Sequence, residues 1–372
     1  MSDLYIGLMS GTSLDGIDGV LADFSGPRMR VTHHASAGFA PALRAELLAL
    51  NTPGDNELHR AALAGNALSR AYAEVVHALL AHSDLPASAI RAVGAHGQTV
   101  RHRPQEFDDT GYTLQLLSPA LLAERTGIAV VADLRSRDVA AGGQGAPLVP
   151  AFHQGVFGRP GETVLVLNIG GISNLSVLGA DGSVLGFDCG PGNALMDHWC
   201  QLHTGQPFDR EGAWAATGQV LPGLLESLMQ EPFLHKPPPK STGRDLFNPP
   251  WLAGHLERFG PAAPAAPADV QATLTEFTAT ACATSVSSYK NNSKTLAICG
   301  GGALNTQLMR RLQALCPTLQ VVATEALGLP ALQVEAAAFA WLARQALHQA
   351  PGNLPSVTGA VGPRVLGAVY PA

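Results

Sequence analysis

The chain has 372 residues, of which 46% are apolar and 14% are charged, and its formal net charge is −6. A chain of this length exceeds the size at which a single hydrophobic core usually stops growing, so we expect two domains with a cleft between them. Its 23 lysines and arginines are thinly spread, which argues against nucleic-acid binding, and no apolar stretch approaches the roughly 20 residues that cross a bilayer.

The N-terminus indicates a cytoplasmic protein. Residues 1–4 carry no basic leader, and no apolar signal segment follows them. The five cysteines are odd in number and scattered, without a Cys-x-x-Cys pair or a Cys/His spacing typical of zinc. We therefore expect neither disulfides nor a structural metal.

The first part of the chain predicts a mixed α/β half-domain. A strand from Leu4 leads into a glycine-rich turn over residues 10–16, and residues 17–24 return beside it as a second strand. The Ala/Leu-rich region after it is typical of helices. The remaining predicted elements are helices within 41–82 broken at 51–54, strands over 90–95, 112–116 and 128–132, a loop over 101–111, and a helix over 119–126.

The second part repeats this order. After a glycine-rich crossing at 140–147 and a helix at 148–157, a strand over 164–167 reaches a second glycine-rich turn, from which 175–178 return. The later predicted elements are a strand over 183–187, a helix from about 194, a Pro-rich stretch at 237–239, an Ala/Pro linker at 261–268, a helix over 270–289 and a strand over 295–299. The repetition indicates an internal duplication within the α/β class.

The first turn contains residue types that hold phosphate groups. Gly11, Thr12 and Ser13 offer backbone amides and hydroxyls, and Asp15 and Asp18 follow. Carboxylates repel phosphate unless Mg²⁺ intervenes, so these aspartates suggest a metal-bridged nucleotide, although an ordinary hairpin turn explains them equally well. The chain has no Gly-Lys dipeptide and no complete Gly-x-Gly-x-x-Gly. A nucleotide would therefore bind through hairpins.

Two later glycine turns follow buried strands in the same way. The second turn lies within residues 168–174, from Asn168 to Asn174. The third turn, from Gly300 to Ala303, follows the last predicted strand. The last turn suits a contact to adenosine or ribose, because glycine lets the backbone approach a flat group closely. Taken alone, it is more simply a tight connection into a helix. Three such turns at strand ends together favour a nucleotide site.

Asp188 is the strongest catalytic candidate. It follows a short strand and precedes a turn of glycines and Pro191, in which fixed and unusual dihedral angles can aim a carboxylate. The alternative is that Asp188 caps the helix beginning near Ala194, a role for which Asn193 is an equal or better candidate. The catalytic interpretation is the one we favour.

Polar residues at two further strand ends suit recognition of a sugar. His96, Gly97 and Gln98 follow the strand over 90–95, although a single histidine there is more often structural. Arg135 and Arg137 could orient an acidic ligand, or could form surface ion pairs that contribute little. For the two arginines the surface interpretation is the simpler one.

Taken together, six ordered motifs resemble those of the bacterial anhydro-N-acetylmuramic acid kinases over almost the whole chain. They lie at 11–18, 96–99, 138–147, 168–174, 188–193 and 300–303. The resemblance implies the superfamily of actin, hexokinase and the heat-shock chaperone ATPases, in which duplicated ribonuclease H-like domains close on ATP. The implied domains are residues 1–134 with about 355–372, and residues 135–354, the second carrying the catalytic aspartate and the adenosine site.

The reaction implied by the resemblance joins two events. Water opens the 1,6-anhydro ring of the sugar while O6 takes the γ-phosphoryl group of ATP, giving N-acetylmuramate 6-phosphate in peptidoglycan recycling. Asp188 matches the general base that deprotonates the water. Because a phosphoryl group takes the place of the usual proton on the leaving oxygen, no carboxylic-acid partner is needed.

The resemblance also assigns the binding residues. It implies nucleotide contacts at Gly11, Thr12, Ser13, Leu14, Asp15, Gly16, Ile17, Asp18, Asn168, Gly170, Gly171, Ser173, Asn174, Gly300, Gly301, Gly302 and Ala303. It implies sugar contacts at His96, Gly97, Gln98, Arg135, Arg137, Asn193 and Glu335. Asp15 would meet Mg²⁺ through Mg-ATP, and a homodimer is implied. The rival functions are another phosphotransferase of the superfamily and a nucleotide-gated binding protein.

Overall fold

The computed structural model describes residues 3–11, 14, 16–243, 246–260 and 265–372. The contacts within the chain divide it into two compact units, Met1–Val156 with Leu332–Ala372, and Phe157–Ala331. The sequence-based boundaries differ from these. Residues 135–156 and 332–354, which they assign to the second domain, lie in the first unit.

The sheet of the first unit has the strand order β13-β7-β4-β1-β2-β3. Strands β1, β2 and β3 form an antiparallel meander, β4 and β7 run parallel to β1, and β13 closes the far edge antiparallel to β7. The strands are β1 (Leu4–Met9), β2 (Ile17–Asp23), β3 (Arg30–Ala37), β4 (Ile90–Ala95), β7 (Val130–Ala132) and β13 (Ala368–Tyr370).

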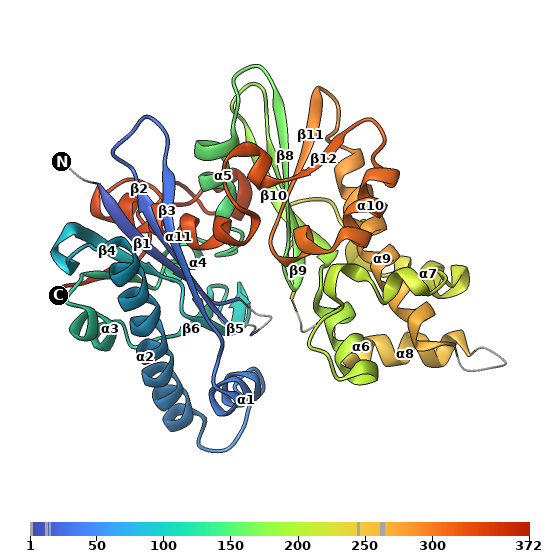
Figure 1. Cartoon of the computed structure of the whole chain (residues 1–372), viewed down its shortest axis with the longest axis horizontal. Coiled ribbons are helices and arrows are strands. Elements are labelled where there is room, and N and C mark those ends of the chain that lie inside the picture. The colour runs from blue at the N-terminus through green and yellow to red at the C-terminus, as the bar shows by residue number, and fades with distance from the viewer. Residues whose placement is uncertain (1–2, 12–13, 15, 244–245, 261–264) are drawn as a thin grey trace. The chain divides into compact units, whose positions relative to one another are not determined.

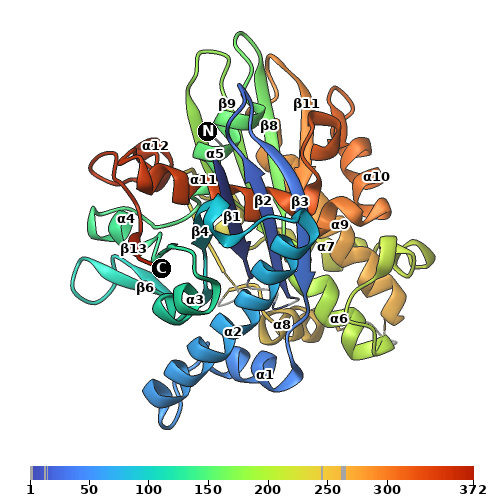
Figure 2. The same ribbon diagram turned by 60° about the vertical axis from the view of Figure 1, so that its left-hand side comes forward.

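Helices cover both faces of this sheet. Figure 2 shows α2 (Glu57–Ser83) crossing in front of β2 and β3, and its apolar side chains Leu68, Tyr72 and Val76 are buried there with Ile6 and Leu21. On the other face, α11 (Val334–Leu347) lies directly on β1 and β4 (Figure 1). The other helices of this unit are α1 (Pro41–Ala49), α3 (Pro119–Thr126), α4 (Ser136–Ala140), α5 (Val149–Phe157) and α12 (Pro355–Thr358).

The second unit repeats the same strand arrangement, with the order β10-β9-β8-β11-β12. Here β8, β9 and β10 form the antiparallel meander, and β11 and β12 run parallel to β8. The strands are β8 (Thr163–Ile169), β9 (Ile172–Leu178), β10 (Val184–Pro191), β11 (Ser293–Cys299) and β12 (Gln320–Ala323). The helices are α6 (Ala194–Thr204), α7 (Pro222–Met229), α8 (Pro249–Phe259), α9 (Pro267–Ser287) and α10 (Thr306–Leu315).

Each unit therefore contains three antiparallel strands followed by two parallel ones, in matching spatial order. This confirms the predicted α/β class with duplicated ribonuclease H-like domains and mixed sheets flanked by helices. No helix in the part of the chain that the structure describes is long and apolar enough to cross a membrane.

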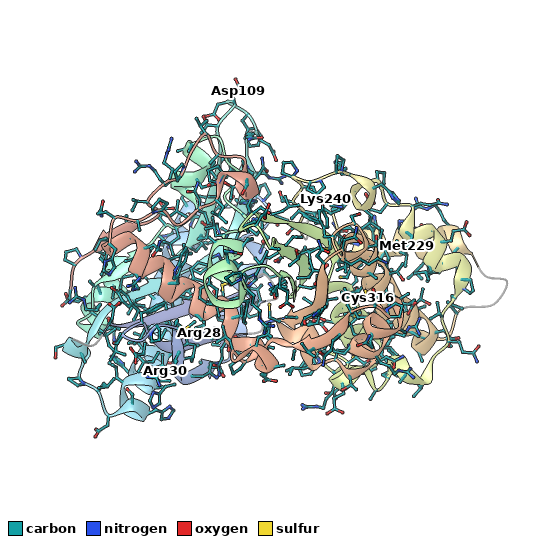
Figure 3. The ribbon with its side chains drawn as sticks, turned by 90° about the horizontal axis from the view of Figure 1, so that it is seen from above. Arg28, Arg30, Asp109, Met229, Lys240 and Cys316 are labelled. Atoms are coloured by element: carbon teal, nitrogen blue, oxygen red, sulfur yellow. The ribbon has the colours of Figure 1, made fainter. Side chains whose placement is uncertain are left out.

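Two strands of the first unit differ from the sequence-based expectation. Residues 30–37 form the edge strand β3, where no element was predicted. The predicted loop at 101–111 is wrong over its first part, because Gln98–Pro104 forms β5, which pairs with β6 (Gly111–Leu116) as an antiparallel hairpin. Asp109 marks the tip of this hairpin in Figure 3.

Candidate active site

In the first unit, the turn after β1 is held from both sides. The side chain of Ser10 is buried, and its Oγ lies 2.9 Å from the hydroxyl of Tyr72 and 3.1 Å from the carbonyl oxygen of Gly97. The N–H of Leu14 donates to the carbonyl of Gly11, and Leu14 has a φ of 57°. A Cβ on Gly16 would lie 2.6 Å from the carbonyl oxygen of Ala37. Thr12, Ser13 and Asp15 lie outside the described residues.

The residues after β4 contact this turn directly. Nδ1 of His96 lies 3.2 Å from the carbonyl oxygen of Ser10, and Nε2 of Gln98 donates to the carbonyl oxygen of Gly11 at 3.1 Å. Both side chains are almost completely buried. The structure thus brings the first and second motifs together, with the second supporting the backbone of the first.

Arg135 adds the next contact. Its Nε and Nη2 lie 3.1 and 3.0 Å from Nε2 of His96, and its Nη1 donates to the carbonyl oxygen of Gly145 at 2.8 Å. Burial and the adjacent guanidinium lower the pKa of His96 to about 3, so the imidazole is neutral. The Arg137 side chain is exposed two residues away.

The other predicted residues of this unit lie on two elements. Asp18 lies on β2, where its Oδ1 is 3.2 Å from Nε2 of His34, and its side chain is 41% exposed. Ile17 begins the same strand and is buried. Glu335 lies in the first turn of α11, one helical turn before Phe339, whose ring packs against His96 with centroids 4.8 Å apart.

In the second unit, three polar residues form one row across the sheet. The strand register pairs Asn168 of β8 with Asn174 of β9, and Asn174 with Asp188 of β10. Laterally paired residues project from the same face of a sheet. The Oδ1 atom of Asn174 is buried and has no hydrogen-bond partner within the described ranges. This row therefore offers amide groups next to a carboxylate.

The glycine turns of the second unit converge on the end of this row. The N–H groups of Asn193 and Gly192 donate to the carbonyls of Gly170 and Gly171 at 2.7 and 2.9 Å. Nδ2 of Asn193 donates to the carbonyl of Ile169. Ser173 is fully buried, and its hydroxyl donates to the carbonyl oxygens of Gly190 and Pro191.

The turn after β11 packs against the same place. Gly300 has a φ of 77°, and a Cβ there would lie 2.5 Å from Oδ1 of Asn168 and 2.7 Å from the carbonyl oxygen of Ile169. Gly302 also packs against Ile169, and Ala303 donates its N–H to Gly300. Close backbone approach explains why glycine occupies both positions. Gly301, between them, is exposed.

Asp188 is oriented by a bulge and by a distant segment. The register shifts between Asp188 and Gly190, so Cys189 is an extra residue on β10. The backbone N–H of Thr242 donates to Oδ2 of Asp188 at 2.8 Å, and the N–H of Asp188 donates to the carbonyl of Lys240. Asp188 does not cap α6, whose N-cap residue is Asn193.

The supporting segment at 240–242 was not predicted. Nζ of Lys240 donates to the carbonyls of Phe233 and Leu234 at 3.2 and 3.0 Å and lies 4.8 Å from the centre of the Phe233 ring. Lys240 is labelled in Figure 3. Burial lowers the pKa of its ammonium group. The only sequence signal was a Lys-Ser-Thr run directly after the proline stretch.

Comparisons with known proteins point to one family. The model of the family described as anhydro-N-acetylmuramic acid kinase matches residues 3–372. Proteins of that name from Variovorax paradoxus and Albidiferax ferrireducens are 68% and 62% identical to this chain, covering 100% of it and 99% and 100% of their own lengths. A solved activator of the 2-hydroxyisocaproyl-CoA dehydratase from Clostridium difficile with bound ADPNP covers 93% of this chain and 97% of its own, at 12% identity and a TM-score of 0.44, a likeness too distant to bear on the site.

Proposed function

This chain belongs to the anhydro-N-acetylmuramic acid kinase family, and from that premise we propose how its residues open the sugar ring and phosphorylate the sugar. The protein is an ATP-dependent sugar kinase of peptidoglycan recycling. The observation that carries the mechanism is the row formed by Asn168, Asn174 and Asp188, in which Thr242 fixes one carboxylate oxygen of Asp188.

Asp188 is the general base in this proposal. It takes a proton from a water molecule whose oxygen forms a bond to C1 of the anhydro-sugar, while the bond from C1 to the bridging oxygen breaks. The released pair on that oxygen, O6, forms the bond to the γ-phosphorus of ATP, and the bond to the β–γ bridging oxygen breaks to release ADP. The proton on Asp188 then passes to solvent.

The glycine turns hold the nucleotide. Backbone amides at glycine turns and side-chain amides bind phosphate oxygens without adding negative charge. We assign phosphate contacts to the turn at residues 11–18 and to the turn at residues 170–174. Adenosine is assigned to 300–303, where the backbone lies open at Gly301.

Mg²⁺ accompanies the ATP in this account. The described residues contain no cluster of three or more His, Cys, Asp or Glu side chains that could hold a metal ion by themselves. Mg²⁺ is usually bound by one or two carboxylates together with substrate phosphates, and the partly exposed carboxylate of Asp18 suits that arrangement. When bound, the ion neutralises charge on the phosphates. Asp15 is the other candidate ligand.

The sugar is assigned to polar side chains of the motifs described above. Arg135 offers a planar guanidinium, which suits the lactyl carboxylate of the sugar. The family resemblance leads us to assign further sugar contacts to Gly97, Gln98, Arg137, Asn193 and Glu335. His96, whose two ring nitrogens face Ser10 and Arg135, is assigned to the same site through Arg135. The family resemblance also leads us to propose that the protein is cytoplasmic and forms a homodimer. Sedimentation velocity tests the dimer directly.

ADP release measured with and without 1,6-anhydro-N-acetylmuramic acid tests the proposed function. We expect turnover only when the sugar is present, with one ADP formed per sugar phosphorylated. ATP hydrolysis that is equally fast without the sugar would instead indicate a nucleotide-gated binding protein. Phosphorylation of a different acceptor in place of this sugar would indicate another phosphotransferase.

A further inference from the structure

A continuous set of hydrogen bonds links the first phosphate turn to the chain near residue 358, entirely within the first unit. It begins at the carbonyl of Ser10, which receives Nδ1 of His96, and continues from Nε2 of His96 to Arg135. From there Nη1 of Arg135 donates to the carbonyl of Gly145, whose N–H donates to Oδ2 of Asp138 at 2.8 Å.

Asp138 anchors the far end. Its carboxylate is completely buried, and Oδ1 accepts from Nδ2 of Asn353 at 2.6 Å and from the hydroxyl of Thr358 at 2.8 Å. The N–H of Gln144 also donates to the carbonyl of Thr358. A buried carboxylate with this many donors fixes the glycine loop that carries Gly145.

The chemistry of the donors determines the tautomer of His96. A guanidinium has only donors, so Nε2 of His96 must accept from Arg135 and Nδ1 must carry the hydrogen given to Ser10. The imidazole thus orients the guanidinium through Nε2 and holds the backbone of the phosphate turn through Nδ1. His96 is therefore suited to present Arg135 to an anionic group while holding the phosphate turn.

We propose that His96 is a positioning residue that couples the binding of the sugar at Arg135 to the arrangement of the phosphate turn at Ser10 and Gly11. This inference rests on the proposed function, because it takes Arg135 as a contact to the sugar carboxylate. A shift of the guanidinium toward the sugar changes the imidazole position, which changes the backbone of Ser10. Occupation of one site then alters affinity at the other.

We call the path from Arg135 through His96 to Ser10 the relay. Two variants each break one of the two hydrogen bonds that the His96 imidazole makes in it. In His96→Asn the amide nitrogen reaches the position of Nδ1 and keeps the bond to Ser10, but the acceptor that Nε2 offers to Arg135 is lost. In His96→Gln the amide oxygen reaches the position of Nε2 and keeps the acceptor for Arg135, but the bond to Ser10 is lost. His82→Asn, on the exposed end of α2, is the matched control.

The experiment measures the dissociation constant of Mg-AMPPNP by calorimetry, with and without saturating 1,6-anhydro-N-acetylmuramic acid. We expect the sugar to tighten nucleotide binding by about 5- to 150-fold in the natural protein and in His82→Asn. The ratio should fall to within about twofold of one in both His96 variants. The same ratio in all proteins, or a ratio of one in the natural protein, overturns the relay.

The outcomes separate this inference from the proposed function. If the natural protein binds no anhydro-sugar, the proposed function fails and the relay fails with it. If sugar and nucleotide both bind but independently, only the relay fails. Should the variants not fold, ¹⁵N NMR of the natural protein labelled at histidine decides. The relay requires His96 to carry its proton on Nδ1 and Nε2 to shift on adding sugar, whereas protonation at Nε2 contradicts it.

Discussion

Two backbone contacts with the segment at 240–242 help to place Asp188, and the Lys240 ammonium interacts electrostatically with its carboxylate. The bulge at Cys189 sets the direction of the strand, and the N–H of Thr242 fixes one oxygen of the carboxylate. A general base must lie within hydrogen-bond reach of the proton it takes, so such fixing matters more than a large change in basicity.

Replacing Asp188 tests its assignment as the base. We expect Asp188→Asn to lower kcat by about 10²- to 10⁴-fold, because the attacking water loses its proton acceptor. Affinity for Mg-AMPPNP should stay within about twofold, since the substitution keeps the shape of the side chain. Stopped-flow ADP release and calorimetry measure the two quantities.

Asp181→Asn is the matched control for that variant. Asp181 lies in the exposed turn before β10, where its carboxylate accepts hydrogen bonds from the backbone N–H and the hydroxyl of Ser183. Its turnover should equal that of the natural protein. Near-normal turnover of Asp188→Asn, or an equal loss in Asp181→Asn, would remove Asp188 from the mechanism.

His153 gives the stability of the protein a pH dependence. This histidine of α5 is completely buried, and desolvation lowers its pKa to about 3 from about 6.5 in an unfolded chain. Between those values the unfolded chain binds one more proton. Above about pH 6.5 protonation of His153 therefore does not lower the unfolding free energy. Below that pH it lowers the unfolding free energy by about 1.4 kcal/mol per pH unit.

Urea unfolding between pH 7 and pH 5 measures this effect. We expect the unfolding free energy of His153→Gln to fall less steeply with decreasing pH than that of the natural protein, by up to about 1.4 kcal/mol per unit. His82→Gln should leave the slope unchanged, because that histidine is exposed. Parallel slopes for all three proteins would show that His153 is protonated in the folded state.

Some residues of the site could be predicted and others could not. Asp188 and the glycine turns carry a local signal, because unusual backbone angles and close approach leave glycine and proline in the sequence. Thr242 contributes a backbone N–H from 54 residues away, and a backbone donor leaves no mark on residue type. Sequence also suggested sugar contacts for His96, but not that both ring nitrogens are engaged by Ser10 and Arg135.

At the scale of elements, two strand glycines determine where α11 lies. A Cβ on Gly7 of β1 would collide with the carbonyl oxygen of Ala336, and one on Gly94 of β4 with that of Phe339. The helix backbone therefore rests directly on the sheet, at positions without side chains. Gly7 and Gly94, in the interiors of two strands, were the sequence features that could have indicated that residues 332–354 pack with the first unit.

Filling one of these positions should loosen the helix. We expect Gly94→Ala to lower the unfolding free energy by about 1–3 kcal/mol or more, because backbone atoms of α11 must move. Gly155→Ala, in α5 with open space around it, should raise it by up to about 1 kcal/mol. Urea unfolding compares the two. A Gly94→Ala protein as stable as Gly155→Ala would contradict this packing.

The strands that the sequence did not predict are polar ones. β3 alternates exposed and partly buried residues and includes two histidines, so it lacks the apolar run that marked β1 and β8. β5 contains three basic residues and ends in proline, yet Arg101 is held by an ion pair with Glu57. Pairing with a neighbouring strand, not hydrophobicity, makes these segments strands.

At the scale of the whole molecule, the two units repeat one arrangement of strands but differ in what supports their glycine turns. Each unit supplies a turn after its first strand, and the two have diverged. The first turn is supported by His96 and Gln98, whereas the second is supported by Asn193 and the Gly300 turn. Asp188, which we propose as the base, lies on β10 of the second unit, at the place in the sheet that β3 occupies in the first unit.

The central claim is that one protein opens the anhydro ring with water while phosphorylating the oxygen released. Product formed from unlabelled anhydro-sugar and ATP in H₂¹⁸O tests it most directly, with ¹³C NMR locating the label. We predict that ¹⁸O appears in the hydroxyl on C1 and that the phosphate ester at O6 contains none. Label in the phosphate group, or a phosphorylated sugar with its anhydro ring intact, would contradict the account.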